Sequence, residues 1–295
     1  MTTVLWDSDY VAYAAGFAVQ HTDRALIEKH EAGWRVHVGS EDDAEAFKEL
    51  AADFSGEVFT RVYLEDGALE KALHNARSMI TGTMRQLEEA YPALAPFEYR
   101  FHLTGTGNFR DEIATIRQYK GNREKTSRPL LYADIRRWMV QTYGAMTTYG
   151  WEADDIIATE ACQARWKPII VHVDKDLLQL PGRHFIPGKG GKTVSKQGSL
   201  AFFYRQMLTG DTADNIPGVY KCGPKRAEAV VHKDMTERQM WLAVLDEYVA
   251  SWEKHGDTQY APCDSPYDAA VENARLLWLV RDGKDSPLWL PPGER

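Results

Sequence analysis

Two short runs of mainly apolar residues, each ending in acidic residues, constrain the fold of this chain most strongly. Residues 3–6 lead directly into Asp7, and residues 167–173 lead directly into Asp174. Segments with helical spacing of apolar residues lie between the runs, and this alternation predicts an α/β fold with a mainly parallel sheet. Because ligands of such sheets bind outside the carboxyl ends of the strands, we expect both aspartates at a functional edge.

Further apolar patterns predict the remaining elements. Apolar residues recur at helical spacing from residue 68 to 91, and Pro92 and Pro96 end that helix. Residues 22–65 predict an insertion in the alternating pattern. We expect strands at residues 3–6, 34–38, 97–103 and 167–173, helices at residues 10–19, 41–52, 68–91, 130–143 and 151–162, and a loop at residues 104–108.

Composition excludes several classes of protein. With 44% hydrophobic and 11% aromatic residues the chain is not disordered, and no apolar run is long enough to predict a membrane span. Its three cysteines form no disulfide or zinc pattern, which favours the cytoplasm. The net charge of −8 argues at first against nucleic acid, but residues 100–233 contain 21 basic and 13 acidic residues. A basic centre flanked by acidic ends leaves a nucleic-acid partner open.

Four acidic clusters suggest a metal site. Crowded carboxylates repel one another unless positive charge lies among them, and Mg²⁺ or Mn²⁺ prefers such oxygen ligands. Two such ions about 4 Å apart activate water and stabilise the leaving oxygen in phosphodiester hydrolysis. A single acidic pair is more typical of a helix cap or a solvated loop, so the hypothesis depends on all four clusters converging. They are Asp7 with Asp9, Glu152 with Asp154 and Asp155, Asp174 with Asp176, and Asp211 with Asp214.

Two further segments are typical of nucleic-acid binding. Residues 117–128 contain five basic residues and one acidic residue, and Tyr119 beside Lys120 offers a base-stacking face next to a phosphate-binding charge. Residues 216–230 resemble a helix–hairpin–helix, in which Gly223 precedes a proline at the first helical position. A solvated loop and an ordinary helical connector are the respective alternatives.

The order of these motifs resembles the 5′ nuclease superfamily, which is flap-endonuclease-like and PIN-related, and most closely its bacteriophage 5′→3′ exonuclease branch. The resemblance covers residues 3–19 and 97–233. Its motifs are Tyr-Lys-Gly-Asn-Arg at residues 119–123, Glu-Ala-Asp-Asp at 152–155, Val-Asp-Lys-Asp at 173–176 and Gly-Asp-x-x-Asp-Asn-Ile-Pro-Gly at 210–218.

The resemblance implies a PIN/5′-nuclease-like α/β fold with a mainly parallel central sheet flanked by helices, and a helical helix–three-turn–helix module for DNA binding. The nuclease domain would span residues 1–200 and include the insertion near 22–65. Residues 201–295 would contain the module at about 206–233 and a C-terminal extension packed back on the core.

The resemblance also implies roles for individual residues. Lys120 and Arg123 would be catalytic, with Lys120 at the scissile phosphate. A first Mg²⁺ or Mn²⁺ would take Asp7, Glu152 and Asp154, and a second would take Asp174, Asp176 and Asp211, assisted by Asp155 and Asp214. DNA contacts would come from Arg110, Tyr119, Lys120, Arg123, Gly218, Gly223 and Lys225, and hairpin carbonyls would hold a K⁺ ion.

The implied activity is divalent-metal-dependent 5′→3′ exonuclease cleavage from the 5′ ends of duplex DNA, extending to RNA in RNA–DNA hybrids. A structure-specific 5′ flap endonuclease and a catalytically weakened DNA-binding relative stay open as alternatives. The implied location is the cytoplasm, that of an infected bacterial host if the chain is phage-encoded, with no membrane partner.

Two positions depart from the family pattern. Gly105 stands where a carboxylate is usual, so either one ligand of the first metal is missing, or Asp9 or water replaces it. Lys221 and Cys222 stand where Gly and Ile are usual, and Lys221 would be strained if its position requires a positive φ.

Overall fold

The computed structural model describes residues 1–30, 33–40, 57–122, 128–283 and 288–294. Its chain divides into two compact units. The larger consists of Met1–Asp9, Thr83–Thr126 and Val140–Arg295, and the smaller of Tyr10–Gly82 and Ser127–Met139. The predicted boundary at residue 200 stays a prediction. None of the described helices is long and apolar enough to cross a membrane.

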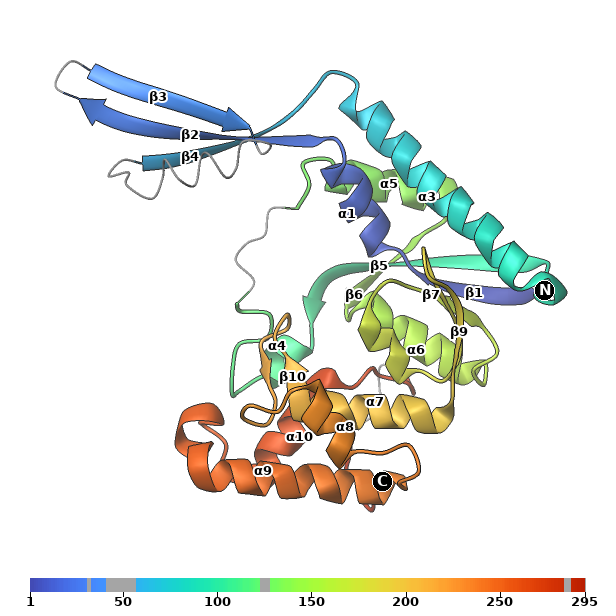
Figure 1. Ribbon diagram of the computed structural model, residues 1–295. Helices are drawn as coiled ribbons and strands as arrows, with labels where there is room; N and C mark the ends of the chain where they lie inside the picture. Colours follow the sequence, from blue (N-terminus) through green and yellow to red (C-terminus); the bar gives the residue numbers. More distant parts are fainter. Residues whose placement is uncertain (31–32, 41–56, 123–127, 284–287, 295) are drawn as a thin grey trace. The chain divides into compact units, whose positions relative to one another are not determined.

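A six-stranded sheet in the order β6-β5-β1-β7-β8-β9 forms the centre of the larger unit (Figure 1). All neighbouring strands are parallel except β8 and β9, which confirms the predicted α/β class with a mainly parallel sheet. The strands are β1 (Thr2–Asp7), β5 (Phe97–Asn108), β6 (Met146–Gly150), β7 (Ile169–Val171), β8 (Gly182–Ile186) and β9 (Gly190–Val194).

Strand β1 lies inside this sheet, between β5 and β7. Leu5 pairs with Ile170, and Asp7 pairs with His102 of β5. The inner strands of a parallel sheet are covered on both faces, so their residues are apolar in succession instead of alternating. Leu5 and Trp6 of β1 are accordingly both fully buried. This register brings the carboxyl ends of β1, β5 and β7 to one edge.

The C-terminal half of the larger unit packs around a second core. Its helices are α7 (Lys196–Thr209), α8 (Pro224–Val230), α9 (Glu237–Gln259) and α10 (Pro266–Leu277). Phe203 and Tyr204 of α7 are fully buried there, and the Tyr248 hydroxyl of α9 donates a hydrogen bond to Met207 O at 2.8 Å. Asn273 of α10 donates to the Tyr248 hydroxyl at 2.8 Å, so α7, α9 and α10 are joined by buried hydrogen bonds as well as by apolar contact.

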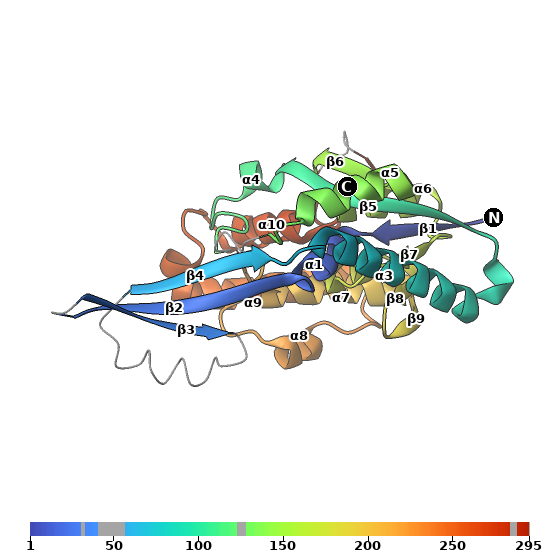
Figure 2. The same ribbon diagram turned by 90° about the horizontal axis from the view of Figure 1, so that it is seen from above.

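The smaller unit contains a three-stranded antiparallel sheet in the order β3-β2-β4, whose strands lie side by side in both views (Figures 1 and 2). They are β2 (Gln20–His30), β3 (Gly33–Ser40) and β4 (Glu57–Leu64). The remaining elements of the chain are α1 (Asp9–Phe17), α3 (Ala68–Ala90), α4 (Arg110–Ile113), α5 (Tyr132–Tyr143), α6 (Ala153–Gln163), β10 (Gly210–Asp211), β11 (Ile216–Pro217), and the 3-10 helices Pro92–Leu94 and Lys175–Gln179.

Most predicted elements are confirmed, with one error. The strand at 34–38 lies within β3 and the helix at 68–91 is α3, whereas the helix at 41–52 falls outside the described residues. The predicted loop at 104–108 is wrong, because β5 continues to Asn108, which pairs with Gly150 after a shift in register. Its glycines predict a turn locally, but pairing with β6 keeps the segment extended.

Candidate active site

The carboxyl edge of the main sheet holds both N-terminal aspartates. Asp7 is the last residue of β1 and is 8% exposed, and its Oδ1 accepts a hydrogen bond from Asp9 N at 3.4 Å. Asp9 Oδ2 accepts a hydrogen bond from Thr104 N of β5 at 2.8 Å. Backbone groups of the N-terminal segment and of β5 therefore fix these side chains at the edge where the sequence places them.

Helix α6 begins at the same edge with three acidic residues. Glu152 is its N-cap, and Asp154 and Asp155 lie in its first turn. Thr104 Oγ1 accepts a hydrogen bond from Ala153 N at 3.0 Å, which attaches the start of α6 to β5. The positive end of the helix dipole favours negative side chains at these positions.

The carboxylates of Asp7, Asp9, Glu152, Asp154 and Asp174, here called the first group, are crowded together. Burial, together with the charges of Asp9, Asp174 and Glu152, raises the pKa of Asp7 to about 7. Burial also raises the pKa of Asp154 well above its ordinary value, with Asp7 and Asp174 as the next causes. Each of these carboxyls is thus close enough to its neighbours to resist ionisation.

A second group surrounds Asp176, in the 3-10 helix that follows β7. Burial, together with the charges of Asp174 and Asp211, raises its pKa to about 7, and Lys175 opposes the rise. Lys175 Nζ lies 3.0 Å from Asp211 Oδ2. Asp174 therefore acts on both groups, which makes it the carboxylate that the two groups share.

The donor set suits a hard divalent ion, because it consists of crowded carboxylate oxygens at the end of a parallel sheet. Within the described ranges, however, no group of three His, Cys, Asp or Glu side chains is arranged to hold a metal ion. Coordination would require these side chains to turn toward a shared ion.

Lys120 faces the first group from a tight turn with a φ of 55°. Its Nζ forms an ion pair with Glu152 and lies 3.9 Å from Asp214 Oδ2, while its backbone N–H donates to Asp214 O at 2.9 Å. Burial opposes ionisation of Glu152, but Lys120 and Arg110 outweigh it and lower the pKa of that carboxyl. The predicted catalytic lysine is thus beside the predicted ligands, whereas Arg123 falls outside the described residues.

Burial of Arg110 contradicts its predicted DNA contact. Arg110 is 1% exposed, and its two terminal nitrogens donate to the carboxylate of Asp155 at 2.7 and 2.9 Å. It also donates to Leu276 O and Trp278 O, at 2.8 and 2.9 Å. The guanidinium is fully used inside the protein, so its role is structural.

Asp155 is fully buried with this arginine, which differs from its predicted role beside the metal. Besides Arg110, its carboxylate accepts hydrogen bonds from Val280 N at 3.0 Å and Glu152 N at 3.3 Å. Both carboxylate oxygens are occupied by these donors. We therefore assign Asp155 to holding Arg110 and the start of α6.

Tyr119 likewise lies in the core and not on a DNA-binding face. It is 5% exposed and its ring packs in the C-terminal core. Its hydroxyl donates to Asp214 Oδ2 at 2.9 Å and lies 3.2 Å from Glu152 Oε2. Tyr119 therefore orders two carboxylates, and its ring is not available for base stacking.

The hairpin residues divide into buried and exposed sets. Gly218 is buried, and its carbonyl accepts hydrogen bonds from Gln259 Nε2 at 2.7 Å and Tyr260 OH at 3.2 Å, which contradicts a DNA contact there. Gly223, the N-cap of α8, and Lys225 are exposed, as a contact with a phosphate requires.

The two departures from the family pattern have structural explanations. A Cβ at Gly105 would lie 2.2 Å from Thr148 O, so no side chain fits there without a backbone shift. Asp9 accepts a hydrogen bond from the backbone N–H of Thr104, the residue before Gly105, and so places a carboxylate next to Gly105. Lys221 has a φ of 52°, which confirms the strained turn expected for a lysine at this position.

Sequence reasoning missed several residues that contact the acidic groups. Gln206 of α7 donates to Asp176 Oδ1 at 2.6 Å, and the buried Gln179 donates to Gln206 Oε1 at 2.8 Å. No local pattern marks these glutamines, because their partners are distant in sequence. Lys175, the partner of Asp211, could have been found, since it lies within the acidic motif itself.

One protein family resembles the middle part of this chain. Residues 55–196 match the family described as the 5′-3′ exonuclease N-terminal resolvase-like domain. This segment, slightly less than half of the chain, is therefore similar to a 5′-3′ exonuclease N-terminal domain. The matched residues include Asp174 and the start of α6, whereas Asp7 lies outside them.

Curated proteins similar to this chain include DNA polymerases. DNA polymerase I of Mycobacterium tuberculosis (strain ATCC 25618 / H37Rv) is 31% identical over 187 residues, which are 56% of this chain and 20% of that protein. DNA polymerase I of Geobacillus stearothermophilus is 28% identical over 238 residues, 71% of this chain and 26% of that protein. The chain thus spans about a fifth to a quarter of these relatives.

Solved structures with detectable similarity include two nucleic-acid enzymes. The T5 5′-exonuclease with bound zinc has a TM-score of 0.48 and 19% identity, covering 68% of this chain and 80% of that one. The catalytic core of Rad2 in complex with DNA substrate has a TM-score of 0.39 and 15% identity, covering 73% and 76%.

Substitution of Gly105 tests the steric explanation for the missing carboxylate. Gly105→Ala and Gly105→Asp should each lower the free energy of unfolding by about 1–3 kcal/mol, because the added Cβ meets the Thr148 carbonyl. Gly82→Ala is the control, since nothing lies within 4 Å of its Cβ. Chemical denaturation measures the difference, and a fully stable Gly105→Asp variant would contradict the explanation.

Asp7→Asn tests the repulsion within the first group. The pKa of Asp7 rises from 3.8 to about 7 on folding, so its carboxyl lowers stability as pH increases through that window. Without divalent ions, Asp7→Asn should therefore raise the free energy of unfolding at pH 8 by about 2 kcal/mol, with little effect at pH 4. Asp246→Asn, at an exposed position on α9, should change stability at neither pH.

Proposed function

We propose that this protein is a divalent-metal-dependent nuclease that cleaves duplex DNA from its 5′ ends in the 5′→3′ direction. The observation that carries the proposal is the pair of carboxylate groups sharing Asp174 at the carboxyl edge of the sheet. Carboxylates that raise one another's pKa are costly to bury, and a bound divalent ion offsets that cost.

Two Mg²⁺ or Mn²⁺ ions would use the two groups of carboxylates. Divalent ions supply an activated water and stabilise the leaving oxygen in phosphodiester hydrolysis. The first ion would be held by Asp7, Glu152 and Asp154, and the second by Asp174, Asp176 and Asp211, with Asp9 beside the position of the missing family carboxylate.

Lys120 would bind and orient the phosphate next to the cleaved bond. Its side chain is 26% exposed, so a phosphate can reach the ammonium group, and its backbone is fixed by the carbonyl of Asp214. A substrate phosphate would compete with Glu152 for this ammonium group, which leaves Glu152 available to the first ion.

Exposed basic residues of the hairpin would bind the DNA backbone away from the cleaved bond. Lys221 precedes Gly223 by two residues, and Lys225 and Arg226 follow it. All three basic residues are exposed. Phosphate contacts from such residues position a duplex without reading its sequence. A K⁺ ion at the hairpin carbonyls belongs to this proposal, at carbonyls other than that of Gly218.

Asp174→Asn tests the assignment of the shared carboxylate. Turnover of a 5′-labelled duplex with Mg²⁺ should fall at least about 100-fold, while the Kd for DNA stays within about threefold, because the second ion loses a ligand and the first group loses a neighbouring negative charge. Asp246→Asn should retain full turnover. Normal turnover by Asp174→Asn would contradict the proposed function.

Product analysis on several substrates separates the alternatives. Mononucleotides released from a 5′-labelled duplex support the exonuclease, whereas oligonucleotides released from a 5′ flap indicate a flap endonuclease. Release from an RNA–DNA hybrid would extend the substrate range to RNA. DNA binding without cleavage at millimolar Mg²⁺ or Mn²⁺ would indicate a relative that only binds DNA.

A further inference from the structure

Residues 114–122 carry Tyr119 and Lys120 but form neither helix nor strand. Without a regular backbone ladder, contacts with other elements must fix the position of such a segment. At its C-terminal end, Lys120 N donates to Asp214 O at 2.9 Å, and Asn215 Nδ2 donates to Gln118 O at 2.9 Å.

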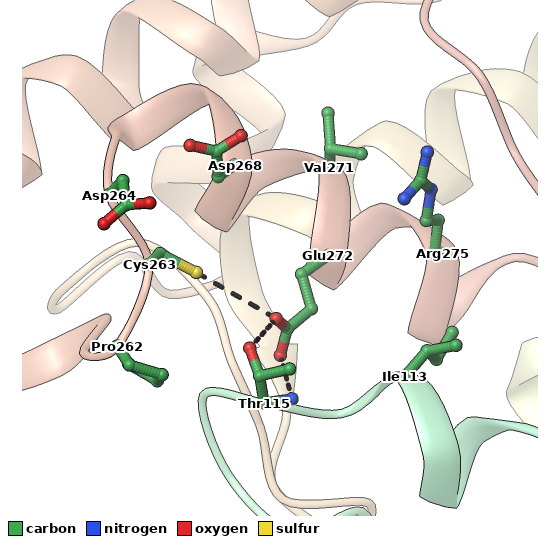
Figure 3. A pocket seen from close by; sticks show the side chains of 9 residues that line it. All are labelled: Ile113, Thr115, Pro262, Cys263, Asp264, Asp268, Val271, Glu272 and Arg275. Atoms are coloured by element: carbon green, nitrogen blue, oxygen red, sulfur yellow. Dashed lines mark hydrogen bonds between the residues drawn. The ribbon is translucent and has the colours of Figure 1, made fainter.

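One carboxylate of α10 holds the other end of this segment. Glu272 Oε1 accepts hydrogen bonds from Thr115 N and Ile116 N, each at 2.8 Å, and its Oε2 accepts one from the Thr115 hydroxyl. Figure 3 shows Glu272 extending from α10 toward Thr115, with the Cys263 thiol approaching the same carboxylate. Two consecutive backbone N–H groups on one carboxylate make charge-assisted bonds that fix backbone direction.

One turn further along, α10 also binds Arg110, which precedes this segment in the sequence. Arg110 donates to Leu276 O at 2.8 Å, and residues 272 and 276 are four apart on α10. Ile116 packs against the C-terminal core to which α10 belongs. Helix α10, which lies outside the residues matched by the exonuclease family, therefore holds residues 110–116 at two points.

We propose that Glu272 is a positioning residue that sets the location of Lys120 in the active site. The inference rests on the proposed function, because it assigns Glu272 to the lysine that would orient the phosphate. Three residues lie between Ile116 and Lys120, and on this proposal a shift at the first displaces the second. Misplacement of a reacting group by about 1 Å can lower turnover about 100-fold.

The experiment compares Glu272→Ala, Glu272→Gln and Asp264→Ala in Mg²⁺-dependent cleavage of a 5′-labelled duplex. Glu272→Ala should lower kcat about 10- to 100-fold with KM changed less than about threefold. Glu272→Gln should stay within about threefold, because its carbonyl oxygen can accept both backbone bonds and its amide can donate to Thr115. Asp264→Ala removes an exposed carboxylate from the same cavity and should retain full activity.

A double-mutant cycle separates positioning from general destabilisation. In a Lys120→Ala background, Glu272→Ala should lower kcat by less than about threefold, because its effect passes through the absent ammonium group. An equal loss in both backgrounds, or an unchanged kcat for Glu272→Ala alone, would overturn the inference. If the alanine variant does not fold, Glu272→Asp replaces it, since the shorter side chain keeps the charge but withdraws the acceptor.

Trypsin cleavage after Arg117 measures the same contact without any DNA. Glu272→Ala should speed this cleavage at least about fivefold in the full chain, whereas Asp264→Ala and Glu272→Gln should not. Wild-type protein that never cleaves DNA, together with this pattern, would refute the proposed function while retaining the contact. Active wild-type protein with unchanged trypsin cleavage in Glu272→Ala would refute the inference alone.

Discussion

The buried ion pair between Arg110 and Asp155 is the interaction on which the rest of the site depends. The guanidinium makes two bonds to the carboxylate and two more to carbonyls that end α10, and the carboxylate also accepts the N–H of Val280. These bonds join α6, α4 and the C-terminal segment at one point. Removing one partner would leave an unpaired buried charge, at a cost of about 3–5 kcal/mol.

The Arg110–Asp155 pair is neutral, but the negative charge of the other carboxylates in the site exceeds the positive charge of the lysines near them. Asp7 and Asp176 each have a pKa of about 7 because burial and neighbouring carboxylates oppose ionisation. Among the lysines of the described residues, Lys120 and Lys175 lie close to the acidic groups. Lys120 pairs with Glu152 and Asp214, and Lys175 pairs with Asp211. The fold thus holds a concentration of negative charge that a divalent cation would stabilise.

Sequence patterns predict those features of this site that depend on short segments. Asp7 follows an apolar strand, and the positive φ of Lys221 follows from its place in a glycine-type turn. Burial of Arg110 and Tyr119 could not be predicted, because distant C-terminal helices cover them and basic or aromatic residues in a polar segment favour an exposed loop. Extension of β5 past Gly105 depends on pairing with β6, which no local pattern reveals.

Calorimetric titration of Mn²⁺ tests most directly the claim that two carboxylate groups share one member. At pH 8, wild-type protein should bind two ions, and Asp174→Asn should weaken both binding events because Asp174 acts on both groups. Loss of one event with the other unchanged would contradict a shared carboxylate, and no binding in the millimolar range by wild-type protein would contradict the metal site itself.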